Sequence, residues 1–139
     1  MPNKIIEIAL AQYGQTGIIG KNSNKIILDY FHEIGATWIQ DDDTAWCSAF
    51  INWVLKKANL PYSSRLNARN FLTYGNKTTK PKIGDIVILW RIEKNSVYGH
   101  CGFYVNESAD SVFILGGNQD NSVNIKGFSK DKVLDYRTI

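Results

Sequence analysis

Apolar residues recur at helical spacing through the first half of the chain. Stripes of apolar residues three or four positions apart predict three helices, at residues 5–13, 26–34 and 45–58. Gly14 and Gly35 follow the first two stripes, at the position where glycine commonly ends a helix. Pro61 ends the third segment, and residues 66–74 predict a shorter fourth helix.

After Gly75 the pattern changes to short runs of β-branched and aromatic residues bounded by Gly, Asn, Ser and Asp. These runs predict strands at residues 85–90, 99–105 and 112–115, with weaker candidates at 123–125 and 133–136. Helices followed by strands with short connections indicate an α+β domain, with the N-terminal helices packed on a mostly antiparallel β-sheet. The length of 139 residues fits one domain, over residues 1–139.

Composition and charge exclude several classes of function. Hydrophobic residues make up 44% and charged residues 21%, and no apolar run is long enough to span a membrane. The net charge of +3 comes from scattered lysines rather than a basic run, so we expect no nucleic-acid partner. The two cysteines and two histidines lack the spacing of a zinc site, and we expect no metal or organic cofactor.

Cys47 is a candidate nucleophile because of its place in the chain. The run Asp-Asp-Asp-Thr at residues 41–44 is a strong N-cap signal ahead of the third predicted helix. With Thr44 as the N-cap, Cys47 is the third helical residue, in the turn whose free N–H groups carry partial positive charge. That position favours a thiolate. The alternative is a small apolar residue packed in the core.

His100 is the candidate base. Gly99 and Gly102 flank it at the start of a predicted strand, which leaves room for another backbone or a substrate to approach the imidazole. A thiolate nucleophile needs such an imidazole to take its proton and later to protonate the leaving group. The alternative is a histidine hydrogen-bonded at a strand edge.

A third polar group should orient the imidazole, and we expect it on the strand that pairs with the histidine strand. Asn118 ends such a strand, and its side-chain oxygen can accept a hydrogen bond from one ring N–H. Gln119 takes this role if the register differs by one residue, because such a shift turns the side chain to the other face. A plain turn at residues 116–118 is the competing interpretation.

Cys101 and His32 are not assigned a chemical role. Successive side chains of a strand point to opposite faces, so Cys101 should face away from His100 and should not reach Cys47. We expect Cys101 to be buried in the core. His32 lies beside the apolar stripe of the second predicted helix, and we expect it to be a solvated surface residue.

Four blocks of the sequence resemble, in the expected order, the motifs of CHAP-like proteins within the wider NlpC-type cysteine peptidase superfamily. Residues 43–54 resemble the nucleophile helix, DTAWCSAFINWV. Residues 81–87, PKIGDIV, match the signature P-x-x-G-D-h-h of the first core strand, where h is hydrophobic. Residues 99–105, GHCGFYV, match the histidine-strand motif G-H-h-G-h-h-h. LGGNQ at 115–119, followed by NSV at 121–123, resembles a bacterial and phage CHAP-like subgroup.

The resemblance implies a papain-like fold and hydrolysis of amide bonds in peptidoglycan. Members act as N-acetylmuramoyl-L-alanine amidases or as endopeptidases that cut stem peptides or cross-bridges. By their match to the motifs, Cys47 is the nucleophile, His100 the base and Asn118 the orienting residue, although some CHAP enzymes use Glu near the third position. Cys101 replaces a residue that is more usually aliphatic. Candidates for substrate binding in the groove are Trp46, Trp90, Tyr98 and Gln119.

Peptidoglycan is therefore the expected partner, and a phage lysin, a secreted antibacterial effector and a housekeeping wall hydrolase all fit this sequence. An effector would also have an immunity or inhibitor protein as a partner. Glu7 and Gln12 interrupt the N-terminal apolar residues, so we expect synthesis in the cytoplasm without a Sec signal. Action at the cell wall, in the periplasm or outside the cell would then follow delivery or lysis.

Two rival interpretations of function keep the same fold. One is a catalytically inactive module that binds the wall or a protein, which the retained Cys47 and His100 disfavour. The other is an acyl transferase, which product analysis with a competing amine would separate from a hydrolase.

Overall fold

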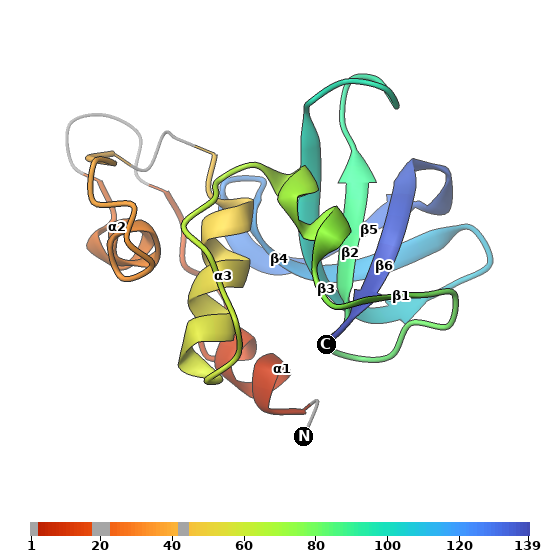
Figure 1. Cartoon of the computed structure of the whole chain (residues 1–139), viewed down its shortest axis with the longest axis horizontal. Helices are drawn as coiled ribbons and strands as arrows, with labels where there is room; N and C mark the ends of the chain where they lie inside the picture. Colours follow the sequence, from red (N-terminus) through yellow and green to blue (C-terminus); the bar gives the residue numbers. More distant parts are fainter. Residues whose placement is uncertain (1–2, 18–22, 42–44) are drawn as a thin grey trace.

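The computed structural model describes residues 3–17, 23–41 and 45–139. In this part of the chain, helices precede a six-stranded sheet (Figure 1). The helical elements are α1 (Asn3–Leu10), α2 (Lys25–His32), α3 (Cys47–Lys57) and the 3-10 helix η1 (Ala68–Thr73). None of the described helices is long and apolar enough to cross a membrane.

The sheet has the strand order β1-β6-β2-β3-β4-β5, and each neighbouring pair is antiparallel. Its strands are β1 (Asn76–Thr78), β2 (Ile86–Trp90), β3 (Gly99–Glu107), β4 (Ser111–Gln119), β5 (Ser122–Ser129) and β6 (Val133–Thr138). A single 3-10 turn, η2 (Lys130–Lys132), joins the last two. The predicted α+β class with an antiparallel sheet is confirmed.

Helix α3 packs between the sheet and α2. Figure 1 shows it alongside the sheet near β3 and β4, with α2 on its other side and α1 near its lower end, and α3 contacts all four of these elements. Phe50, Ile51 and Val54 of α3 are fully buried in a core shared with Ile88 of β2 and Cys101 of β3. The first residue of α3 is thereby placed at the end of this core, next to the start of β3.

The structure corrects the predicted start of the third helix. It begins at Cys47 rather than at Ala45, and the N-cap residue is Trp46, which makes no capping hydrogen bond with its side chain. Trp46 is fully buried and packs against Tyr30, with ring centroids 6.0 Å apart. The tertiary packing of this indole, which local capping patterns do not contain, sets the start of the helix. Thr44, the predicted N-cap, lies outside the described residues.

Two further differences concern weak local signals. The predicted fourth helix is only the short 3-10 helix η1. Strand β1 was not predicted, because its three residues are polar and show no apolar alternation; backbone pairing with β6 alone makes it a strand.

Candidate active site

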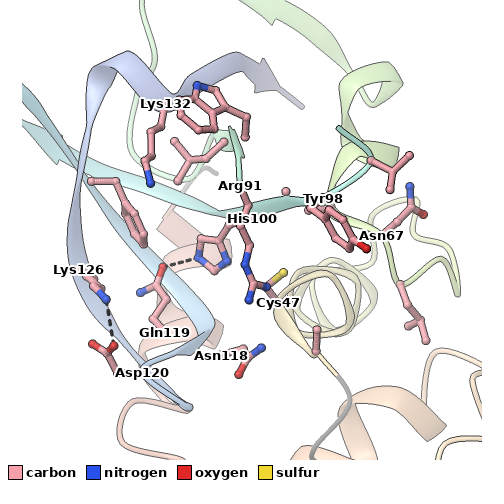
Figure 2. A pocket seen from close by; sticks show the side chains of 18 residues that line it. Cys47, Asn67, Arg91, Tyr98, His100, Asn118, Gln119, Asp120, Lys126 and Lys132 are labelled. Carbon is pink, nitrogen blue, oxygen red and sulfur yellow. Dashed lines mark hydrogen bonds and ion pairs between the residues drawn. The ribbon is translucent and has the colours of Figure 1, made fainter. Parts of the chain in front are cut away.

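Cys47 and His100 meet where the first turn of α3 comes up to the start of β3. The thiol and the imidazole lie close enough that each shifts the pKa of the other. Both side chains line a cavity of about 620 Å³, into which Figure 2 shows the sulfur and the ring pointing. As the first residue of the helix, Cys47 has a backbone N–H without an acceptor inside the helix. The predicted pair is therefore brought together.

Cys101 also contacts Cys47, which corrects the expectation that it would face away. Its thiol and its backbone N–H both stabilise the Cys47 thiolate and lower the pKa of Cys47. His100 and Cys101 therefore both act on this sulfur, although successive side chains of a strand point in opposite directions. The expected burial of Cys101 is confirmed, since the residue is fully buried.

Gln119, rather than Asn118, holds the imidazole. The Nε2 of His100 lies 3.0 Å from Oε1 of Gln119 (Figure 2). The pairing of β4 with β5 is irregular between Gly116 and Gln119, and Asn118 has a positive φ of 57°. This bulge breaks the alternation of side chains along β4, so the residue after Asn118 faces the ring. Asn118 instead lines the cavity.

The amide of Gln119 is itself fixed by its neighbours. Its Nε2 donates to the carbonyl oxygen of Ile114 at 3.1 Å, to the carbonyl oxygen of Asn124 at 2.8 Å and to Oδ1 of Asn124 at 2.9 Å. Because three acceptors surround this position, it must be the amide nitrogen, and the amide oxygen Oε1 therefore faces His100. The side chain is almost fully buried. This oxygen can only accept, so the Nε2 of His100 must carry a proton.

The tautomer of His100 follows from this network. With Nε2 protonated and bonded to Gln119, the neutral ring keeps Nδ1 free as the base for the thiol. This is the arrangement that a proton transfer from Cys47 requires.

Electrostatics favour an ion pair between the two groups. The hydrogen bond from the Cys101 thiol is the largest cause that holds the pKa of Cys47 well below the usual value of a thiol. Burial opposes it, while the hydrogen bond and charge of His100 add to the lowering. Burial would lower the pKa of His100, but its hydrogen bond to Cys47 and the thiolate charge, helped by Gln119, give a net rise. Arg91 partly opposes that rise through its charge.

Of the four predicted groove residues, three line the cavity and one does not. Trp90 and Tyr98 are part of its wall, on the two sides of the loop between β2 and β3. Trp46 is fully buried in the core and does not line the cavity, which corrects its assignment. Gln119 borders the cavity but is occupied with His100.

Sequence reasoning missed the polar residues that fix the walls. Ser48 and Asn52 on α3 donate to the carbonyl oxygen of Arg65, at 2.9 and 3.2 Å, and so hold the loop that carries Leu66 and Asn67 against the helix. These are buried polar residues on an otherwise apolar helix face. That pattern is the signal by which the sequence could have indicated them.

The opposite wall depends on Arg69. Its guanidinium donates to the carbonyl oxygens of Tyr98 at 2.9 Å, Glu93 at 3.2 Å and Lys94 at 3.1 Å. The loop after β2 is thus tied to η1.

His32, which was expected at the surface, is instead half-buried, and a nitrogen of its ring hydrogen-bonds with the carbonyl oxygen of Ile39.

Basic side chains dominate the charged rim of the cavity. Arg91, Lys126 and Lys132 line it together with one carboxylate, Asp120, which pairs with Lys126 at 3.0 Å. Figure 2 shows Arg91 extending toward the Cys47–His100 pair, and no described residue forms an ion pair or side-chain hydrogen bond with its guanidinium. Among the described residues there is no cluster of three or more His, Cys, Asp or Glu placed to hold a metal ion.

A thiol at the start of a helix, an imidazole on the adjoining strand and an amide behind the ring define the papain-like class of cysteine hydrolase sites. Comparison with known families agrees with that class. The model of the CHAP domain matches residues 39–118, and the chain belongs to this family.

Solved structures of the NlpC/P60 group share the fold. NlpC1 from Trichomonas vaginalis matches with 16% identity and a TM-score of 0.61, over 98% of this chain and 43% of that chain. A protein similar to lipoprotein, of the NLP/P60 family, from Staphylococcus aureus subsp. aureus Mu50 matches with 18% identity and a TM-score of 0.59. The match covers 99% of this chain and 41% of that chain. This chain thus spans about two fifths of each structure. A search of curated proteins found no match.

Proposed function

We propose that this protein is a cysteine hydrolase that cleaves an amide bond in peptidoglycan. The observation that carries the proposal is the pairing of Cys47 and His100 at a cavity wall, where each shifts the pKa of the other, with Gln119 behind the ring. Membership of the CHAP domain family relates the chain to cysteine peptidases and hydrolases. The experiment described below distinguishes an amidase from an endopeptidase by the products that each releases.

In the proposed acylation, the Cys47 thiolate attacks the carbonyl carbon of the scissile amide. The backbone N–H of Cys47, unbonded within the helix, donates to the oxyanion that forms. The protonated Nδ1 of His100 then gives its proton to the amine nitrogen as the C–N bond breaks. The amine leaves and the acyl group remains on Cys47 as a thioester.

In the proposed deacylation, His100 acts as a base. Its Nδ1 takes a proton from water while the water oxygen attacks the thioester carbon. The C–S bond breaks, the carboxylic product leaves, and the thiolate–imidazolium pair is restored. Gln119 keeps Nε2 protonated through both steps, because its oxygen accepts that proton's hydrogen bond throughout.

The cationic rim favours a substrate that carries carboxylates near the scissile bond. Arg91 reaches toward the reacting pair and its guanidinium has five donors for a carboxylate. Peptidoglycan stem peptides contain such carboxylates. Two aromatic side chains, Trp90 and Tyr98, add apolar surface at the same wall. Action on such a substrate also makes the cell wall, the periplasm or the outside of the cell the proposed place of work.

The test is incubation of the purified protein with sacculi of different cross-link types, followed by mass spectrometry of the muropeptides. We expect new free amine ends and no new reducing sugar ends, with no reaction from Cys47→Ser. A competing amine that appears in the product would identify acyl transfer instead of hydrolysis. Reducing ends without amines would overturn the cysteine-hydrolase proposal, because a glycosidase normally needs paired carboxylates. Unchanged sacculi with Cys47 still reactive would point to an amide substrate outside the wall.

A further inference from the structure

The proposed nucleophile has a second thiol as a direct neighbour. Cys47 and Cys101 belong to the same core cluster, and Cys101 directly follows His100 on β3. Each thiol shifts the pKa of the other. Both cysteines are free in this structure. Hydrolysis as described above uses only the first thiol, so the second is left without a chemical role.

The two thiols differ in their access to reagents. Cys47 is 6% exposed and lines the cavity, whereas Cys101 is 0% exposed and lies in the core behind it, on the side of β3 that packs against α3. A small oxidant that enters the cavity therefore meets Cys47 first. Cys101 is within reach of Cys47 but out of reach of the solvent.

We propose that Cys47 and Cys101 form a reversible redox pair, in which a peroxide oxidises Cys47 and Cys101 resolves the product as an intramolecular disulfide. The proposal rests on the reactive Cys47 thiolate of the proposed function. It does not depend on which amide that thiolate cleaves.

In the first step the thiolate of Cys47 attacks one oxygen of hydrogen peroxide. A sulfur–oxygen bond forms and the O–O bond breaks. The leaving hydroxide takes the proton of the His100 imidazolium and departs as water. Cys47 is now a sulfenic acid, two electrons more oxidised, and the peroxide has been reduced.

In the second step the sulfur of Cys101 attacks the sulfur of the sulfenic acid. The S–S bond forms, the S–O bond breaks, and the leaving hydroxide takes the Cys101 proton and departs as water. While Cys47 is a thiolate, burial above all, and then the hydrogen bond and charge of Cys47, raise the pKa of Cys101 and keep it protonated. Oxidation of Cys47 to an uncharged group removes the thiolate's charge, so Cys101 then loses its proton more readily.

The disulfide would inactivate the site reversibly and would protect Cys47 from further oxidation. It removes the nucleophile and leaves no sulfenic acid for further oxidation to the sulfinic acid, which is irreversible without a dedicated enzyme. A dithiol reductant restores both thiols. Closing the bond brings the two sulfurs to about 2.0 Å.

The experiment treats the purified wild-type protein with hydrogen peroxide and maps the cysteines by mass spectrometry without reduction. We expect loss of two hydrogen atoms from the intact mass, a linked peptide containing Cys47 and Cys101, loss of iodoacetamide labelling at Cys47, and recovery of labelling with dithiothreitol. Oxygen added at Cys47 without a linked peptide would overturn the proposal. This measurement needs no variant and no activity.

Cys101→Val is the matched variant, since valine is apolar and similar in size. Peroxide should leave its Cys47 as a sulfenic acid that dimedone traps, and longer exposure should give a sulfinic acid that dithiothreitol does not reverse. Equal recovery of the variant and the wild type would contradict a resolving role for Cys101. A linked peptide together with unchanged sacculi would refute only the wall substrate, and hydrolysis without a linked peptide would refute only the redox pair.

Discussion

The side chain of Gln119 serves two different partners with its two ends. Its oxygen accepts from His100 while its nitrogen donates to Ile114 and Asn124. An amide is well suited to this position because one end can only accept and the other can only donate. The ring is therefore held by a group whose orientation is already determined by the hairpin.

Gln119→Ala should lower kcat by about 10- to 100-fold, because the imidazole loses the contact that fixes its tautomer and angle. Asn118→Gly is the matched control, since glycine adopts the positive φ at this position without strain. We expect a smaller loss of kcat from Asn118→Gly, measured on the same muropeptide substrate. If Asn118→Gly lowered kcat more than Gln119→Ala, Asn118 rather than Gln119 would be the residue that orients the imidazole.

Cys47 should react with iodoacetamide much faster than Cys101 at neutral pH. The pKa of Cys47 is lowered first by the Cys101 thiol and then by His100, so the thiolate persists below the pH at which ordinary thiols are protonated. Labelling should slow only as the pH falls through that lowered pKa. The measurement is the alkylation rate against pH, with each cysteine identified by peptide mapping.

The Cys101 thiol should set part of that pH profile. Cys101→Val removes the hydrogen bond that stabilises the thiolate, so the pKa of Cys47 rises and its alkylation curve moves to higher pH. Cys101→Ser keeps a donor at the same place and should move the curve less. An unshifted curve for the valine variant would show that the backbone N–H of Cys101 and His100 suffice.

Among the elements, the approach of α3 to β4 positions the site most directly. A Cβ placed on Gly117 would lie 2.8 Å from the Cβ of Phe50 and 2.8 Å from the ring of Trp46. Only glycine lets β4 come this close to the helix that carries Cys47. In the sequence Gly116–Gly117, the second glycine is thus required for the close packing of β4 on α3, and not only for a turn.

Gly117→Ala should destabilise the fold by about 1–3 kcal/mol, because the extra methyl group forces β4 and α3 apart. It should also reduce the rate of Cys47 alkylation, since the thiol then moves away from His100. Gly127→Ala is the control on the neighbouring strand, where the added Cβ would be 3.0 Å from the edge of Phe113, a residue that does not line the cavity. Thermal unfolding compares the two, and similar melting temperatures would contradict the close approach at Gly117.

The elements were predicted better than their ends. Apolar periodicity located the helices and most strands, because it follows directly from which faces are buried. The start of α3 at Cys47 depends on the burial of Trp46, and the choice of Gln119 depends on a bulge in β4. Both are tertiary features that a local pattern does not contain. The interaction of Cys101 with Cys47 was missed because alternation was taken to separate them, whereas both the thiol and the backbone N–H of Cys101 act on the Cys47 sulfur.

On the scale of the whole molecule, charge is concentrated where the cavity opens. Lys126 stands over the ring of Phe128 and Lys132 over the ring of Trp90, at 5.7 and 5.2 Å from the ring centroids. Arg91 completes this rim and points toward the reacting pair. The modest net charge of +3 does not reveal such a local concentration.

Arg91→Gln should raise KM roughly tenfold for a stem peptide with free carboxylates, because one charge-assisted contact is lost. We expect little change in kcat, since the guanidinium binds substrate rather than taking part in proton transfer. Initial rates against substrate concentration separate the two constants. Amidation of the substrate carboxylates should remove the difference between the variant and the wild type, and a difference that persists would contradict the assignment.

The network around Gln119 also has a consequence for the order in which the molecule folds. Gln119 and Asn124 are joined by hydrogen bonds across the tip of one hairpin, only five residues apart in sequence. Such local contacts close a small loop and cost little chain entropy, whereas Cys47 and His100 come from distant parts of the chain. We therefore expect the acceptor for the histidine to assemble with the β4–β5 hairpin, before the helix that carries the thiol has docked. The last event of folding would then be the one that creates the reactive pair, so a partly folded chain carries no activated thiolate.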